Sequence, residues 1–191
     1  MIAAQRIVES FRAQNKSADC REITGIDKSS VSTRMILRFL ARTAPTGSCF
    51  GMAARYAPAA FSEINAALSE KHTEALPAPL SCSAMLAKKM GASEIHTVMA
   101  AGFAGGIGLS GGACGALGAA IWIIGTRILE NGGTVSFRSS YASDPIARFK
   151  EFTGDEFECS RIVGRKFESI GNHADYVRNG GCSQIIELLA S

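Results

Sequence analysis

Hydrophobic residues recur at helical spacing along nearly the whole chain, separated by polar residues. Two such patterns lie in the first 40 residues, formed by Ile2, Ile7, Val8 and Phe11 and by Val31, Met35, Ile36, Phe39 and Leu40. This spacing predicts amphipathic helices. A third helix is predicted over residues 48–69, and Pro58 should end or kink it near Ala57, because proline cannot donate the helical hydrogen bond.

Two prolines in the segment EALPAPL (74–80) mark the best candidate linker in the chain. After the linker, hydrophobic spacing and capping residues predict helices over residues 81–90, 94–103, 113–130 and 143–152. The segment TVSF (134–137) alone has strand character, and it is too short to found a sheet.

These elements predict an all-α fold, a compact multi-helix bundle with a glycine-rich junction between two central apolar helices. The linker divides the chain into two parts. Residues 1–73 are expected to form an N-terminal helical segment that packs on the main helical domain, residues 74–191.

The glycine-rich junction reads GFAGGIGLSGGACGALG over residues 102–118. Gly106, Gly108 and Gly111 satisfy the G-x-G-x-x-G dinucleotide fingerprint, but that motif has meaning only between a strand and a helix. The preceding segment EIHTVMAAGFA (94–104) is helical in pattern, so nucleotide binding is disfavoured. We expect residues 105–112 to turn the chain between two close-packed helices and to deliver Cys114 into the first turn of the second helix.

Composition and charge argue against a nucleic-acid-binding protein and against a membrane-spanning protein. The chain has 191 residues, 47% of them hydrophobic, and a formal net charge of +3 with scattered basic residues, so nucleic acid is not the expected partner. Arg34, Arg38 and Arg42 share one helical face, either as a solvated stripe or as a site for an acidic partner. Residues 95–126 carry no formal charge, but glycines divide this stretch into pieces too short to cross a bilayer, and no membrane span is expected.

Six cysteines are the most informative residues. The N-terminus lacks the apolar core of a secretory signal, so we expect a cytoplasmic location and free thiols. No Cys-x-x-Cys motif is present, which leaves zinc ribbons and thioredoxin-type sites without support. Cysteines at predicted helix starts should have a lowered thiol pKa, because free N–H groups and the helix dipole stabilise a thiolate; these are Cys49, Cys82, Cys114 and Cys182. The alternative is that they are small buried hydrophobic residues.

A weak internal repeat relates residues 11–25 to residues 149–164, and chance similarity is the alternative explanation. If the repeat is real, the cysteines come in pairs, and the N-terminal pair is Cys20 and Cys49. The role of this pair stays open.

Four segments carry a resemblance to a known family. They read SCSAMLAKKMG (81–91), AAGFAGGIGLSGGACGALGAAIWIIG (100–125), FKEFTGDEFECSRIVG (149–164) and GCSQIIELLA (181–190). Their order resembles that of the redox-active proteins named for their C_GCAxxG_C_C cysteine pattern, over roughly residues 78–191. The resemblance implies that the signature cysteines are Cys82, Cys114, Cys159 and Cys182. One departure is Ala119, where the family usually has glycine.

Three functional hypotheses remain open at this point. In the first, the signature cysteines converge and cycle between dithiol and disulfide, as in a thiol–disulfide oxidoreductase with an unidentified redox partner; Cys114 is the most activated thiolate and Cys82 its expected partner. In the second, the same thiolates hold a metal ion or an iron–sulfur centre. In the third, the chain is a helical interaction module with structural cysteines. A homo-oligomer is compatible with each. The histidines at 72, 96 and 173 are interpreted as surface or capping residues, with His96 also a candidate thiol neighbour.

Overall fold

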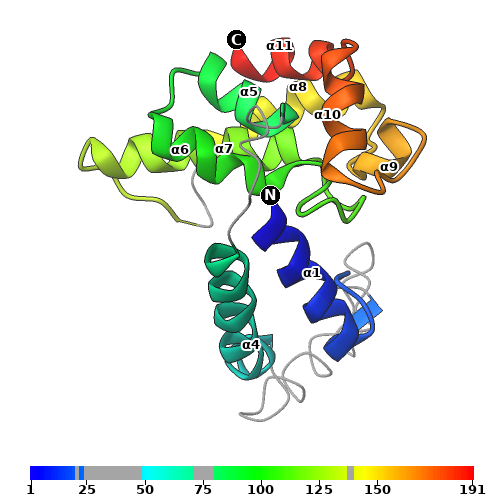
Figure 1. Cartoon of the computed structure of the whole chain (residues 1–191). Helices are drawn as coiled ribbons and strands as arrows, with labels where there is room; N and C mark the ends of the chain where they lie inside the picture. Colours follow the sequence, from blue (N-terminus) through cyan, green and yellow to red (C-terminus); the bar gives the residue numbers. More distant parts are fainter. Residues whose placement is uncertain (20–21, 24–48, 71–79, 137–139) are drawn as a thin grey trace, which may run out of the picture. The chain divides into compact units, whose positions relative to one another are not determined.

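The computed structural model describes residues 1–19, 22–23, 49–70, 80–136 and 140–191, and in these ranges the fold is all-α, with no β-strand (Figure 1). The predicted all-α fold class is therefore confirmed. The predictions for Cys20, for the helix carrying Arg34, Arg38 and Arg42, for His72 and for most of the linker lie outside the described residues. The chain divides into two compact units, one made of Met1–Gln5 with His72–Ser191 and the other of Arg6–Lys71.

The larger unit contains every described signature cysteine. Its elements are α5 (Cys82–Lys89), α6 (Glu94–Ala100), η1 (Ala101–Phe103), α7 (Gly115–Glu130), η2 (Ser140–Ala142), α8 (Ser143–Thr153), α9 (Cys159–Ile162), α10 (Ile170–Arg178) and α11 (Ser183–Ala190). Helix α7 packs against α5, α8 and α11, and α5 also packs against α6 and α11. Leu86 of α5 and Phe149 of α8 are completely buried in the core that these helices share.

Local capping explains where several of these helices begin and end. The side chains of Ser81 and Ser169 accept hydrogen bonds from the N–H groups of Ala84 and Asn172, at 3.3 and 3.1 Å, as N-cap residues do. Gly154 ends α8 in the left-handed conformation that glycine adopts without strain. Helix starts at Cys82, Cys114 and Cys182 agree with prediction to within one residue.

The two helices that flank the glycine run differ in burial. Helix α7 buries seven of its residues, whereas α6 buries only Ala100 and leaves Ile95, Val98 and Met99 more than half exposed. Of the two central apolar helices predicted on either side of the glycine run, only α7 is therefore largely buried. Among the described helices, none combines the length and the apolar character that crossing a membrane requires.

The smaller unit contains α4 (Cys49–Ser69) and most of α1 (Ile2–Asn15). The rings of Phe11 and Tyr56 meet edge to face at 4.9 Å, and the Tyr56 hydroxyl donates a hydrogen bond to the carbonyl of Ile7. Pro58 is predicted to end or kink this helix, but α4 runs through it, so the helix does not end there. The backbone of Cys49 begins α4, as predicted.

Candidate functional site

The glycine run forms a tight loop of left-handed residues between η1 and α7. Gly106 has φ +80°, and a Cβ there would lie 2.6 Å from the amide nitrogen of Gly112, so only glycine fits. At the start of α7, a Cβ on Gly115 would lie 1.7 Å from the carbonyl oxygen of Phe103. Glycine therefore lets the chain fold back on itself and brings α7 against the end of η1, which fixes the position of Cys114.

The same loop is bonded to the segment that carries Cys159. The N–H of Cys159 donates to the carbonyl of Gly112 at 2.7 Å, and the N–H of Cys114 donates to the carbonyl of Phe157, also at 2.7 Å. These bonds flank an isolated antiparallel bridge between Ala113 and Glu158. Because alternate residues of paired segments share a face, Cys114 and Cys159 are carried on the same side of the bridge.

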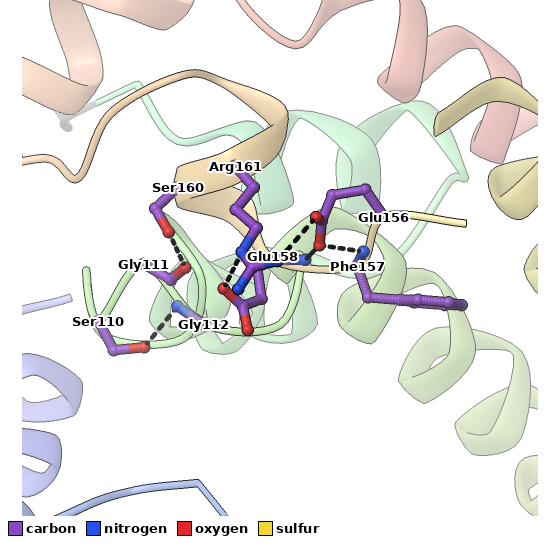
Figure 2. Close-up of polar contacts among 8 residues, drawn as sticks. All are labelled: Ser110, Gly111, Gly112, Glu156, Phe157, Glu158, Ser160 and Arg161. Carbon is purple, nitrogen blue, oxygen red and sulfur yellow. Dashed lines mark hydrogen bonds and ion pairs between the residues drawn. The ribbon is translucent and has the colours of Figure 1, made fainter. Parts of the chain in front are cut away.

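Side chains reinforce this junction. The hydroxyl of Ser160 donates to the carbonyl of Gly111 at 2.8 Å, and the Glu156 carboxylate accepts the N–H groups of Phe157 and Glu158, each at 2.9 Å (Figure 2). Arg161 forms ion pairs with the carboxylates of Glu156 and Glu158. The pKa of Glu156 is held below its usual value, first by the Glu158 N–H and then by the Phe157 N–H and Arg161. The Glu156 carboxylate is therefore charged at neutral pH.

Cys82 and Cys182 form the second close pair of thiols. Cys82 begins α5 and is buried, and Cys182 is the N-cap of α11, with a left-handed φ of +63° that is unusual for a residue with a side chain. Cys182 packs against the core cluster that contains Cys82, and Cys182 is the largest cause that raises the pKa of the Cys82 thiol. Cys182 is therefore the thiol that acts most strongly on Cys82, while Cys114, the partner expected from the sequence, lies in the same core cluster and its pairing with Cys82 stays a prediction.

The two pairs lie near enough to influence each other electrostatically. A charge on Cys82 raises the pKa of Cys114, and charges on Cys114 and Cys82 raise the pKa of Cys159. Four cysteines that are widely spaced in the sequence are thus gathered in one region of the larger unit. All four are free thiols in this structure.

Burial raises the pKa of all three inner thiols. The pKa of Cys82 is raised by its contact with Cys182 and by burial, and burial is the largest cause for Cys114 and for Cys159, whose pKa rises to about 12. The N–H groups of Leu117 and Ala116 at the start of α7 lower the pKa of Cys114 but do not outweigh burial. The expectation that the helix start makes Cys114 an activated thiolate therefore has the wrong sign.

Cys182 is the accessible member of the group. It is half-buried, and it lines an open pocket of about 340 Å³ together with Tyr176, Phe152, Ile162, Val163 and residues 180, 181 and 183–185. Gly181 allows the approach of the Tyr176 ring, because a Cβ there would lie 2.3 Å from a ring carbon. Burial is the largest cause that raises the pKa of the Tyr176 phenol, followed by the charges of Cys182 and Cys159.

Sequence reasoning missed one residue of this region. His173, interpreted as a surface or capping residue, is completely buried on α10, and it lowers the pKa of the Cys82 thiol. Its position next to Ala174 and four residues before Val177, on the apolar stripe of α10, is the signal that could have revealed its burial. His96 contacts Trp122, edge to face, and lies 4.0 Å from Glu130.

The described residues hold no group of three or more histidine, cysteine or acidic side chains arranged to bind a metal ion.

Comparison with protein families identifies the larger unit. The family model described as "Putative redox-active protein (C_GCAxxG_C_C)" matches residues 80–191, which is more than half of the chain. Comparison with curated proteins and with solved structures gave no match. The match covers the glycine loop and the four cysteines that the fold gathers together. The chain therefore belongs to the C_GCAxxG_C_C family of redox-active proteins.

Proposed function

We propose that the chain carries out thiol–disulfide exchange, with Cys82 and Cys182 cycling between a dithiol and a disulfide. The observation that carries this proposal is the packing of Cys182 against the core cluster that contains Cys82, with one thiol buried and the other lining an open pocket. Disulfide exchange needs one sulfur that a substrate can reach and a second sulfur close enough to displace it. Cys182 is the sulfur that a substrate can reach, and Cys82 is the second sulfur.

The reaction has two steps. The thiolate of Cys182 attacks one sulfur of a substrate disulfide, which breaks the substrate S–S bond, forms a mixed disulfide and releases the first substrate thiol. The Cys82 sulfur then attacks the Cys182 sulfur, forms the protein disulfide and releases the second substrate thiol. Two electrons pass from the protein dithiol to the substrate, and the two thiol protons leave with the products.

We assign Cys114 and Cys159 to a second thiol pair beside the first. Their backbone segments are bonded to each other, the charge of Cys114 acts on Cys159, and the charge of Cys82 acts on both. With this arrangement, a further thiol–disulfide exchange would transfer the disulfide from Cys82 and Cys182 to Cys114 and Cys159. A reducing compartment such as the cytoplasm would keep both pairs as thiols at rest.

The test uses an aromatic disulfide that releases a coloured thiolate. Reduced protein is mixed with the reagent, quenched in acid at intervals and digested, and the adducts are located by mass spectrometry. We expect an early adduct at Cys182 that converts to a Cys82–Cys182 disulfide. Cys82→Ser should stop at the adduct, and Cys182→Ser should remove both species. Failure of the wild-type protein to form the protein disulfide would contradict the proposal, and stoichiometric iron or zinc after anaerobic purification would support the metal hypothesis instead.

A further inference from the structure

A completely buried imidazole lies beside the buried thiol of the proposed pair. His173 has no exposed surface, and neither of its ring nitrogens has a hydrogen-bond partner of regular geometry among the described residues. Burying a polar ring without partners costs free energy, and natural proteins rarely accept such a cost without a use for the group. A buried group of this kind therefore needs an explanation beyond packing.

Two neighbours of His173 bear on its role, the ring of Phe167 and the thiol of Cys82. Its ring meets the ring of Phe167 edge to face at 4.9 Å, which holds the imidazole from one side. The thiol of Cys82, on α5, is the titratable group that the ring influences, and the thiol of Cys182 lies beside that of Cys82.

Two further charged or titratable groups lie near the Phe167 ring. The phenol ring of Tyr176 packs against Phe167 with ring centres 5.2 Å apart and a tilt of 52°, and the guanidinium of Arg165 lies 5.4 Å from the centre of each of these two rings. Burial, and then the charges of Cys182, Cys159 and Cys82, raise the pKa of the Tyr176 phenol, so Tyr176 also lies near the thiols. An imidazole in this position can accept a proton from Cys82 without a base from solvent.

The second step of the proposed reaction creates the need for such a group. Cys82 must lose its proton in order to attack the mixed disulfide, yet it is buried away from water. Histidine is the side chain that most readily accepts and returns protons near neutral pH. The contact with Cys182 is the largest cause that raises the pKa of Cys82, and the charge of Cys182 no longer contributes once that sulfur is in a mixed disulfide. His173 then remains as the group that favours the Cys82 thiolate.

We infer that His173 is the proton acceptor for Cys82 in the step that forms the Cys82–Cys182 disulfide. The inference rests on the proposed function. The proton moves from the Cys82 sulfur to a nitrogen of the His173 ring, and the Cys82 sulfur bonds to the Cys182 sulfur. The S–S bond to the substrate half breaks, and the departing thiolate takes up the proton from the imidazolium or from water. The ring returns to its neutral form, so atoms and charge balance over the step.

The experiment separates the two steps in time. Wild-type protein and His173→Asn are mixed with the aromatic disulfide, quenched in acid and analysed by mass spectrometry at a series of pH values. His173→Gln provides a second variant, and circular dichroism checks that each variant is folded. His96→Asn is the matched control, because His96 is a partly buried histidine of the same unit that contacts Trp122 and Glu130.

We expect His173→Asn to form the Cys182 adduct at the wild-type rate and to convert it to the protein disulfide about 100-fold more slowly, the typical loss for a missing general base. Between about pH 7 and pH 9, the second-step rate of the variant should rise about tenfold per pH unit, as for a thiol that solvent must deprotonate, while the wild-type rate changes little. His96→Asn should behave as wild type in both steps.

The outcomes are distinguishable. If the wild-type protein forms no Cys82–Cys182 disulfide, the proposed function itself fails. If the wild type forms it and both folded His173 variants form it at the same rate with the same pH dependence, the role of His173 is overturned while the proposed function stands. If both variants unfold, the wild-type pH profile decides, since a rise of about tenfold per pH unit in its second step would also overturn this role.

Discussion

Replacing Gly115 by alanine tests the close approach that places Cys114. A Cβ at this position would lie 1.7 Å from the carbonyl oxygen of Phe103, 2.5 Å from its carbonyl carbon and 3.2 Å from the nitrogen of Ala104. All three atoms belong to the backbone, so no side chain can rotate away to relieve the contact. The start of α7 and the end of η1 must then separate.

We expect Gly115→Ala to lower the free energy of unfolding by about 3 kcal/mol, the upper part of the range for overpacked sites. The shift should also weaken the hydrogen bond from the Cys114 N–H to the Phe157 carbonyl, and so the junction between the glycine loop and the Cys159 segment. Urea unfolding followed by circular dichroism measures the change, with the slope of the transition checked for two-state behaviour.

The matched control is Gly171→Ala in α10. Its φ is not in the left-handed region, and a Cβ there would meet only the hydroxyl of Ser169 at 3.8 Å. Alanine has the higher helix propensity, so this variant should be unchanged or more stable by up to about 1 kcal/mol. A loss of less than about 0.5 kcal/mol in Gly115→Ala, within the range of ordinary surface substitutions, would refute the close approach of η1 and α7.

Three further predictions concern the thiols and the hydrogen bond from Ser160 to the glycine loop. In reduced native protein, iodoacetamide should modify Cys182 before the other three signature cysteines, because it alone of the four is not buried, and peptide mass spectrometry that found Cys114 modified equally fast would contradict this. Because the pKa of Cys159 is raised to about 12 in the folded protein, the folded state keeps a proton that the unfolded chain loses above about pH 8.5. The contribution of this thiol to the free energy of unfolding should therefore be constant below that pH and should fall above it by up to about 1.4 kcal/mol per pH unit. Urea unfolding midpoints measured from pH 7 to pH 10 should show this fall. The Cys159→Ala variant should show a smaller fall. Ser160→Ala removes the hydrogen bond to the Gly111 carbonyl and should cost about 1 kcal/mol in urea unfolding, whereas an unchanged midpoint would show that the hydroxyl does not brace the loop.

Local patterns in the sequence predicted α5, α6, α7 and α8 and the helix that follows Cys182, but not the short helices α9 and α10. Serine caps and hydrophobic spacing are properties of adjacent residues, and they placed the starts of α5 and α11 correctly. Pro58 shows the limit of this reasoning, because α4 continues through a residue that disfavours helix locally. Packing of the surrounding helical residues can offset one missing hydrogen bond.

The arrangement of the thiols depended on contacts between distant residues. Cys114 and Cys159 are brought together by backbone pairing of the glycine loop with residues 157–160, which no single-segment pattern encodes. The pKa of Cys114 was predicted from the helix start alone, whereas burial by the surrounding helices sets its direction. The burial of His173 could have been inferred from the apolar stripe of α10, but its effect on Cys82, which lies in a distant segment, could not.

Disulfide mapping of the wild-type protein under graded redox buffers tests the central claim most directly. Protein equilibrated at a series of thiol–disulfide ratios is alkylated, digested and analysed for every bond among the four signature cysteines. The account predicts that a Cys82–Cys182 disulfide appears first as the buffer becomes oxidising and reverses when it becomes reducing. Absence of any disulfide between signature cysteines at every ratio, or first formation of a bond that leaves Cys182 free, would contradict it.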